Sequence, residues 1–325
     1  DLFKCPRWSY NEPMVGDLLQ TKLYVPRKRA SLVPRSRLIE ILDQGLARKL
    51  TLVSAPAGFG KTTLVSNWVA ECELPTAWLS LDDEDSDPAR FLIYLAASLQ
   101  TIHTELGRAT LHAFQSEQPP PVKAAVSTLI NEISAISDRI ILVLDDYHLI
   151  KSEAIHNALA YLLEHQPPQL HLVITTREDP PVPLPRWRAR GEITEIREGD
   201  LRFTPTETAA LLNDNMKLNL KPEQIKTLGS KTEGWISGLQ LAALSLRGQA
   251  DVDQFLHSFA GSNRFILDYL IEEVFRQQPP EIRDFLLQTA VLEQLTAPLC
   301  AAVIADGETT VPKAQAMLER LEQAN

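Results

Sequence analysis

A lysine and a threonine that close a short glycine-rich run give the strongest chemical signal in the sequence. The run is Ala55-Pro56-Ala57-Gly58-Phe59-Gly60-Lys61-Thr62, the phosphate-loop pattern with alanine at its first glycine position. Small residues let successive main-chain N–H groups turn toward an anion, and the N-terminus of the following helix adds its dipole. A lysine in the first helical turn opposes that dipole unless an anion is present. The run therefore predicts a site for the phosphates of a nucleotide.

Each side chain of this loop is expected to have its own task. The Lys61 ammonium is predicted to reach the β- and γ-phosphates of ATP, and the Thr62 hydroxyl to bind Mg²⁺. Thr63 can add a contact to the α-phosphate. The predicted nucleotide contacts of the loop are Ala55, Ala57, Gly58, Phe59, Gly60, Lys61, Thr62 and Thr63. The alternative, a flexible glycine turn before an ordinary helix, is disfavoured because strand, loop and helix follow in the required order.

Two carboxylates follow a run of five apolar residues at 140–144. Such a run is typical of a strand buried on both faces of a parallel sheet. Ligands of open α/β sheets bind at the carboxyl ends of the strands, where these two acids stand. Because successive strand residues face opposite ways, we expect separate roles for them. Asp145 is assigned to the Mg²⁺ shell and Asp146 to orienting the water that attacks ATP.

A further apolar run at 170–175 is followed by Thr176 and Arg177. An arginine at this strand end can touch the γ-phosphate and report its presence, so Arg177 joins Lys61 and Asp146 among the predicted catalytic residues. The alternative is a surface arginine paired with Glu178 or Asp179.

Strand and helix patterns alternate through the first 200 residues. Strands are expected at 50–54, 76–81, 140–144, 170–175 and 193–196, and helices at 36–46, 61–72, 88–103, 122–136 and 152–165. Since each parallel step needs a crossover, this order predicts an α/β fold of the P-loop NTPase type with a parallel five-stranded sheet. From about residue 200 only helical periods remain, beginning at a capping box that starts at Thr204. The second half is expected to be all-α.

Composition limits the classes of partner. The formal net charge of −10 argues against this chain holding nucleic acid by itself. No apolar run approaches the roughly 18 residues of a membrane span. The three cysteines are far apart and odd in number, which favours a reducing cytoplasm and excludes a zinc site or disulfide framework. We expect a cytoplasmic protein with no membrane contact.

Two charged runs are interpreted as ordinary surface. The acidic run 82–87 lacks the central glycine and trailing glutamate of a calcium loop, and Pro88 begins a helix after it. It is expected to be a solvated loop in which Asp87 caps that helix. Arg186, Arg188 and Arg190 are expected to form a solvated basic face.

Several blocks together resemble a known family, the large ATP-binding LuxR-type transcription regulators, of which the maltose-regulon activator is the best-known kind. These belong to the signal-transduction ATPases with numerous domains (STAND), alongside the NOD-type receptors. The blocks are 21–26 (TKLYVP), 52–64, 145–149 (DDYHL), 175–177 (TTR) and 234–242 (GWISGLQLA). The resemblance runs from about Leu19 to the end of the chain.

The resemblance implies a modular arrangement and an adenine site. Residues 1–35 would be an N-terminal extension and arm, 36–200 the nucleotide-binding domain, 201–278 a helical domain, and 279–325 the start of an incomplete winged-helix domain. Val33 and Arg35 lie in the stretch that covers adenine in relatives. Gly238 and Gln240 occupy the place of a G-x-P triplet that meets adenine, with glutamine where many relatives have proline.

The favoured function is an ATP/ADP-binding signal-transduction switch of a transcription regulator, with slow ATP hydrolysis controlling activation. Self-association is expected in the ATP state of the full-length protein, and DNA binding only through a downstream helix-turn-helix that these residues do not include. One alternative is an AAA-type motor or loader ATPase (the AAA+ class), with the arginines at 186–190 as candidate fingers in trans. Another is an NLR-like defence or kinase-linked STAND NTPase.

Overall fold

The structure is a computed structural model that describes residues 18–27, 32–114, 120–247, 252–258, 264–276, 278–292, 294–304 and 309–323. The described residues form two compact units. The first, here called the sheet unit, takes its residues from 1–28, 37–53 and 62–196, and the second, the helical unit, from 29–36, 54–61 and 197–325. Of the predicted N-terminal extension, residues 1–17 and 28–31 lie outside the described residues.

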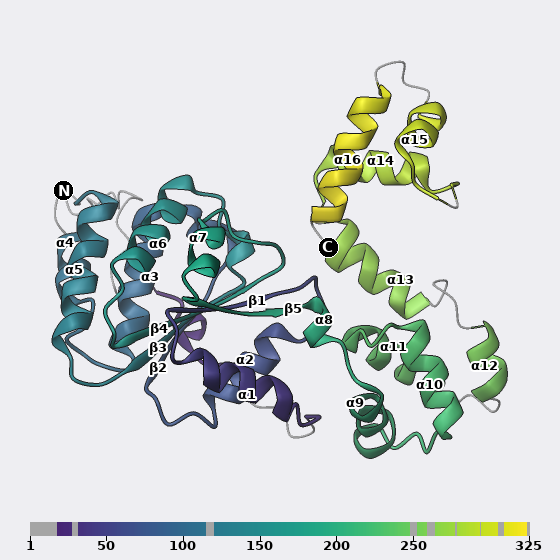
Figure 1. Cartoon of the computed structure of the whole chain (residues 1–325), viewed down its shortest axis with the longest axis horizontal. Helices are drawn as coiled ribbons and strands as arrows, with labels where there is room; N and C mark the ends of the chain where they lie inside the picture. The colour runs from purple at the N-terminus through teal and green to yellow at the C-terminus, as the bar shows by residue number, and fades with distance from the viewer. Residues whose placement is uncertain are drawn as a thin grey trace, which may run out of the picture. The chain divides into compact units, whose positions relative to one another are not determined.

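A five-stranded parallel sheet forms the centre of the sheet unit, as predicted (Figure 1). Its strands stand in the order β2 (Thr76–Ser80), β3 (Ile140–Asp145), β4 (Leu170–Thr176), β1 (Leu50–Ser54) and β5 (Ile193–Arg197). In the register of β2 with β3, Ser80 pairs with Asp145 at the carboxyl ends of both strands. The strand order places the end of β4 between the end of β1 and the end of β3.

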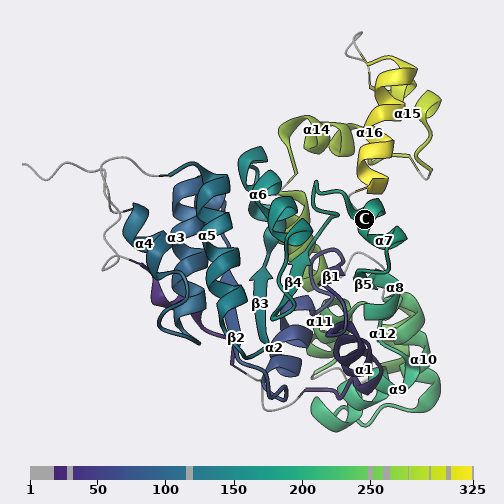
Figure 2. The same cartoon turned by 60° about the vertical axis from the view of Figure 1, so that its left-hand side comes forward.

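Helices cover both faces of this sheet, so its central strands are buried on both sides, as their apolar runs predict (Figures 1 and 2). One face carries α1 (Ser36–Gly45) and α2 (Lys61–Val69). The other carries α3 (Pro88–Gln100), α4 (Arg108–Phe114), α5 (Val122–Ala135), α6 (Glu153–Glu164) and α7 (Leu184–Ala189). Alternate strand residues serve the two faces: Leu142 and Leu172 belong to the core under α3, α5 and α6.

Local capping explains where the helices begin. The Asp87 side chain accepts a hydrogen bond from the main-chain N–H of Arg90 at 2.8 Å, and Pro88 occupies the first helical position of α3. This confirms the predicted cap. In the helical unit, Thr204 and Glu207 bond each other's main-chain N–H groups at 3.2 and 2.8 Å, the reciprocal capping box that the sequence predicts.

The helical unit is built from short helices around its own core. They are α8 (Glu198–Leu201), α9 (Pro205–Ala209), α10 (Pro222–Lys231), α11 (Ile236–Leu246), α12 (Val252–Ser258) and α13 (Arg264–Leu270), with π-helical turns after α9 and α13. Leu212, Leu228 and Leu239 are fully buried in that core. After Arg197 the described residues contain no strand, as the helical periods predict.

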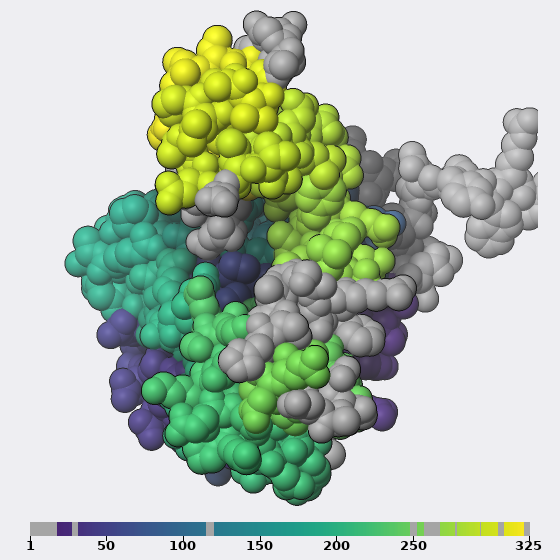
Figure 3. All heavy atoms as spheres, turned by 90° about the vertical axis from the view of Figure 1, so that its right-hand side faces the viewer, coloured from purple at the N-terminus to yellow at the C-terminus, as the bar shows by residue number. Residues whose placement is uncertain are grey.

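The last helices pack around a separate small core. They are α14 (Pro280–Thr289), α15 (Ala297–Val303) and α16 (Val311–Gln323), coloured from yellow-green to yellow in Figure 3. Phe285, Cys300 and Ala314 are buried among them. None of the helices in the described parts of the chain has the length and apolar character needed to cross a bilayer.

Candidate nucleotide-binding site

The phosphate loop joins β1 to α2 and needs glycine at two positions. Gly58 and Gly60 have φ angles of +81° and +77°, a left-handed backbone that residues with a Cβ rarely adopt. A Cβ on Gly58 would lie 2.6 Å from the Ser237 hydroxyl oxygen, and one on Gly60 would lie 3.1 Å from Cδ1 of Ile236. The backbone therefore has the curvature of an anion-binding loop, with no room for a side chain at Gly58 and a tight contact at Gly60.

Lys61, the predicted phosphate ligand, is buried and hydrogen-bonded to the loop itself. Its ammonium donates to the main-chain oxygens of Ala55 and Pro56 at 2.7 and 3.0 Å. Phe59 is also buried, and Thr63 is half-buried in the first turn of α2. In this structure the ammonium therefore binds carbonyl oxygens of the loop, and it would have to leave them to contact a phosphate.

Asp145 and Thr62 lie together, as a shared role at Mg²⁺ requires. The Thr62 hydroxyl donates to Oδ1 of Asp145 at 2.9 Å, and the Asp145 residue is only 3% exposed. Mg²⁺ holds oxygen ligands in an octahedron at about 2.0–2.1 Å, so two adjacent ligands are themselves about 2.9 Å apart. The two oxygens are therefore spaced like neighbouring positions of such a shell.

A magnesium ion here would depend on oxygens from outside the protein. Within the described residues, no group of three or more histidine, cysteine, aspartate or glutamate side chains gathers at one point. Mg²⁺ commonly binds proteins through one or two side chains and completes its shell with phosphate oxygens and water. Thr62 and Asp145 fit this mode of binding, in which two side chains would hold the ion.

Asp146 lies beyond the end of β3. The alternation of side chains along a strand, from which its orientation was predicted, therefore does not apply to it. β3 ends at Asp145, and Asp146 has φ +60° and ψ +41°. Its main-chain N–H donates to the hydroxyl of Thr175 at 3.0 Å, and its side chain is 44% exposed. A left-handed turn, rather than the pleat of the strand, separates the two carboxylates. The water-orienting role of Asp146 stays a prediction.

Thr175 is a site residue that sequence reasoning missed. Its hydroxyl donates to Oδ1 of Asp145 at 2.5 Å while it accepts the N–H of Asp146. It stands at the end of β4, the strand between β1 and β3. In the sequence, Thr175 is recognisable only as a polar residue near the end of an apolar run. Its contact with Asp145 follows from the strand order, which the sequence does not give.

Arg177 follows β4 directly and is half-buried. Asp179, one of the two pairing partners considered for it, forms an ion pair with Arg188 at 3.0 Å. The γ-phosphate sensor role of Arg177 stays a prediction.

The two stretches predicted to meet adenine lie in the helical unit. Val33 packs against the core of that unit, and the Arg35 guanidinium donates to the main-chain oxygen of Leu201 at 2.7 Å and stacks on Phe203. In this structure Arg35 therefore anchors residues 32–35 to the start of the helical unit. The adenine contacts of Val33 and Arg35 stay predictions.

Gly238, the other end of the predicted adenine contact, has a clear packing role. A Cβ there would lie 2.4 Å from a ring carbon of Trp235, so only glycine leaves space for that ring. Gln240 is half-buried in α11. The contacts of both residues with adenine also stay predictions.

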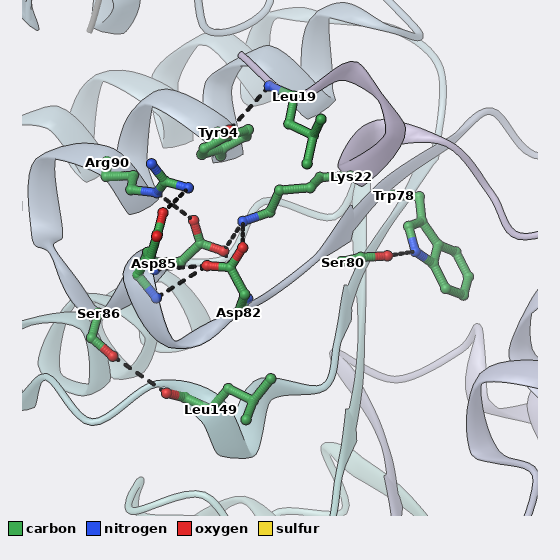
Figure 4. A network of polar contacts seen from close by, with 11 residues as sticks. Leu19, Lys22, Trp78, Ser80, Asp82, Asp85, Ser86, Arg90, Tyr94 and Leu149 are labelled. Carbon is green, nitrogen blue, oxygen red and sulfur yellow. Dashed lines mark hydrogen bonds and ion pairs between the residues drawn. The ribbon is translucent and has the colours of Figure 1, made fainter. Parts of the chain in front are cut away.

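The acidic run 82–87 is not the solvated loop that was expected, because one of its carboxylates is fully buried (Figure 4). Lys22, from the N-terminal segment, binds the carboxylates of Asp82, at 2.9 Å, and Asp85. Arg90 adds a bond to Asp85 at 3.1 Å, and the Lys22 ammonium lies 4.5 Å from the ring centre of Tyr94. Sequence reasoning missed this cluster because its lysine is 60 residues before Asp82.

Electrostatics and geometry give this cluster a structural role. Burial alone would raise the pKa of Asp82, but the hydrogen bond and charge of Lys22, with the charge of Arg90, lower it. The carboxylates are thus bound to protein cations rather than arranged for calcium. They fix residues 18–27 at the carboxyl end of β2.

The three arginines near residue 188 form exposed ion pairs, as expected for a solvated face. Arg186 and Arg190 both contact Glu164, at 3.0 and 3.4 Å. Arg188 contacts Glu195 at 2.9 Å, and these bonds raise its pKa.

A pocket of about 520 Å³ lies in the sheet unit, away from the predicted residues. Its lining includes Arg48, Lys49 and Arg139. Arg48 and Arg139 donate to main-chain oxygens and Lys49 pairs with Glu192, so these cations already serve the protein.

Comparisons with known proteins agree with this geometry. Residues 49–215, about half of the chain, match the NACHT domain family, and residues 271–325 match the MalT winged helix domain. The chain is 36% identical to the serine/threonine-protein kinase PknK of Mycobacterium tuberculosis, over 90% of this chain and 26% of that protein. It is 34% identical to the HTH-type transcriptional regulator MalT of Cronobacter sakazakii, over 94% of this chain and 34% of that protein. The chain thus spans about a quarter to a third of these relatives.

Solved structures share the fold at low identity. A Walker-type ATPase of Pyrococcus abyssi superposes with a TM-score of 0.60 and 16% identity, over 96% of this chain and 94% of that one. A STAND protein of Pyrococcus horikoshii with a tetratricopeptide repeat sensor superposes with a TM-score of 0.51 and 19% identity. The match covers 90% of this chain and 40% of that one. The matched family model covers the phosphate loop, Asp145 and the whole sheet. The chain therefore belongs to the NACHT-domain family, and its residues 271–325 match the MalT winged helix domain.

Proposed function

We propose that this chain is the ATP/ADP-binding switch module of a transcription regulator, and that slow hydrolysis of ATP resets the switch. The observation that carries the proposal is the hydrogen bond between Thr62 and Asp145. Lys61 directly precedes Thr62 in the sequence, so the proposed phosphate ligand and one of the two proposed metal ligands are adjacent residues of the phosphate loop. Such an arrangement suits a nucleotide phosphate chain with its Mg²⁺.

Each residue has a definite part in this proposal. The Lys61 ammonium leaves the loop carbonyls for the β- and γ-phosphates, and Thr62 and Asp145 hold Mg²⁺. Asp146 orients the attacking water, and Arg177 responds to the γ-phosphate. Adenine is held on the side of residues 33–35 and 238–240. The bound metal would neutralise charge on the phosphates.

Switching requires that ATP and ADP differ in their affinity for two conformations. A ligand shifts a conformational equilibrium only by its difference in affinity for the two states, and moving it from 1:99 to 99:1 takes about a 10⁴-fold difference. Arg177 and Asp146 are the residues that would sense the γ-phosphate. Self-association in the ATP state, and DNA binding through a helix-turn-helix, are proposed for the full-length protein.

A motor or loader ATPase is the second candidate, and the ion pairs of its candidate arginine fingers weigh against it. Arg186, Arg188 and Arg190 contact Glu164, Asp179 and Glu195 of their own chain. A finger acting in trans would have to give up these pairs. A kinase-linked STAND protein remains a third candidate, supported by the likeness to PknK.

A turnover measurement separates the switch from the motor. The purified chain is incubated with ATP and Mg²⁺, and phosphate release is followed together with the nucleotide that stays bound after desalting. The switch predicts retained nucleotide and turnover far below the usual enzyme median of about 10 s⁻¹. Turnover near that median with no retained nucleotide would favour the motor.

A further inference from the structure

Four consecutive carbonyls of the phosphate loop accept hydrogen bonds from side chains; they belong to Ala55, Pro56, Ala57 and Gly58. The Lys61 ammonium binds the first two. The indole N–H of Trp235 donates to the third at 3.0 Å, and the hydroxyl of Ser237 donates to the fourth at 3.1 Å. All of these residues belong to the helical unit, so the contacts lie within one compact body.

When the carbonyl oxygens of a loop are hydrogen-bonded on one side, its main-chain N–H groups are left available on the other side. In a planar trans peptide the C=O and N–H bonds point in opposite directions. Donors that hold the carbonyls outward therefore turn the following N–H groups inward, where they form a concave anion site. Dipoles that are already oriented need no rearrangement when the anion arrives, which favours binding.

The contact is reciprocal, because the loop also caps α11. The main-chain N–H of Ser237 donates to the same carbonyl of Gly58, at 3.1 Å. The first N–H groups of a helix have no partner within the helix and need one from elsewhere. The phosphate loop supplies that partner, so α11 begins on the loop.

Trp235 is held in the orientation that this bond needs. Its ring packs edge-on against Tyr269 of α13, with centroids 5.5 Å apart and planes at 60°. Gly238 leaves space for the other side of the ring, as its missing Cβ shows. Packing therefore fixes the direction of the indole N–H, which points at the loop.

We propose that Trp235 and Ser237 are positioning residues that preorganise the phosphate loop for nucleotide. Their role is greatest in the bound state, when Lys61 has moved from its carbonyls to the phosphates. The side-chain bonds that then remain on the loop carbonyls are those of the Trp235 indole to Ala57 and of the Ser237 hydroxyl to Gly58, which also accepts the main-chain N–H of Ser237. The inference rests on the proposed nucleotide binding, and it adds two residues that touch the loop but not the nucleotide.

The test is the dissociation constant for ATP with Mg²⁺, measured by calorimetry on matched variants. Trp235→Phe keeps an aromatic ring and removes the N–H, and Ser237→Ala removes the hydroxyl. Each is expected to weaken binding about tenfold, the effect of losing one well-placed hydrogen bond. Trp187→Phe is the control for the tryptophan, since the Trp187 indole N–H has no hydrogen-bond partner among the described residues. Ser230→Ala is the control for the serine, because its hydroxyl donates to Thr227 within its own turn of α10 and has no other bond within the described part of the chain.

Two readouts distinguish positioning from simple stabilisation. Ser237→Thr, which keeps the hydroxyl, is expected to retain most of the affinity that Ser237→Ala loses. Tryptophan emission is expected to change on adding ATP with Mg²⁺ to the unmodified chain, and to change less in Trp235→Phe. The inference is overturned if Trp235→Phe and Ser237→Ala both bind ATP with the affinity of the unmodified chain. It is also overturned if Ser237→Thr binds ATP as weakly as Ser237→Ala does. If the unmodified chain itself binds no ATP, the proposed function fails instead.

Discussion

The hydroxyl of Thr62 donates to the carboxylate of Asp145 at 2.9 Å, although the two residues are 83 positions apart in the sequence. One opens the helix after the phosphate loop and the other ends β3. The sheet brings them together, so the two oxygens that are proposed to bind Mg²⁺ are spaced as neighbouring ligands.

Replacing Asp146 with asparagine is expected to leave ATP binding intact and to block hydrolysis. The change keeps the size of the side chain but removes the charge that orients the attacking water. Phosphate release in single-turnover conditions measures the loss, and calorimetry measures binding. Asp138→Asn, at an exposed position outside the site, is the control. Unchanged phosphate release would assign the water to another residue.

Replacing Thr175 with valine is expected to weaken Mg²⁺ binding about 10- to 100-fold, the usual effect of removing an outer hydrogen bond to a metal ligand. Valine keeps the shape of threonine but cannot donate to Asp145 or accept from Asp146. A titration of ATP affinity against Mg²⁺ concentration measures the shift. An identical Mg²⁺ dependence in the variant would show that the carboxylate needs no such support.

Replacing Lys22 with methionine is expected to destabilise the sheet unit by up to about 3–5 kcal/mol, because buried Asp85 would lose one of its two cations and keep only Arg90. Chemical denaturation measures the loss. The control is Lys151→Met, since the exposed pair of Lys151 with Asp83 should contribute less than about 1 kcal/mol.

The double variant Lys22→Met with Asp85→Asn completes this comparison. Removing the buried charge together with its partner should recover part of the lost stability. Equal losses for Lys22→Met and Lys151→Met would contradict the structural role of the cluster.

His171 is expected to make folding stability depend on pH. It is buried in β4, donates from Nδ1 to the main-chain oxygen of Arg48 at 2.9 Å, and accepts at Nε2 from the hydroxyl of Thr51. Burial, with a smaller effect of the Arg139 charge, lowers its pKa from 6.5 to about 4.

The sign of this dependence follows from which state binds the proton. Between about pH 6.5 and pH 4 the unfolded chain binds a proton that the folded chain excludes, so stability falls as pH falls through that window. Above this pH window the contribution of neutral His171 to the free energy of unfolding is fully present. About 3 kcal/mol of it is lost as the pH falls through the window. Denaturation at several pH values measures the slope, and His171→Gln should remove this part of it. If His171→Gln shows the same slope as the unmodified chain, the pH dependence of stability arises from another residue.

Local patterns predicted the features that depend on neighbouring residues. The apolar run 140–144 and the glycines of the phosphate loop specify a buried strand and a tight turn without help from distant parts of the chain. The side chains of Asp87 and Thr204 cap their helices by accepting main-chain N–H groups only three residues later, so their positions were also predictable. The short helix α7 is absent from the predicted helices, although Pro185 stands in its first turn, where proline is favoured.

Features that depend on long-range contacts could not be predicted. Thr175 meets Asp145 only because β4 lies beside β3. Trp235 meets Ala57 from 178 residues away, and Asp85 is buried because Lys22 folds back onto it. In each case the residue type permitted a role, but only the tertiary structure supplied the partner.

The binding of ATP with Mg²⁺ by the unmodified chain and by Lys61→Ala, measured by calorimetry, tests the central claim most directly. The account predicts that the variant loses affinity about a hundredfold or more, because the ammonium is the charged group that faces the phosphates. Lys151→Ala, which removes an exposed ammonium, should bind as the unmodified chain does. Undiminished affinity in Lys61→Ala would contradict the assignment of the phosphate loop.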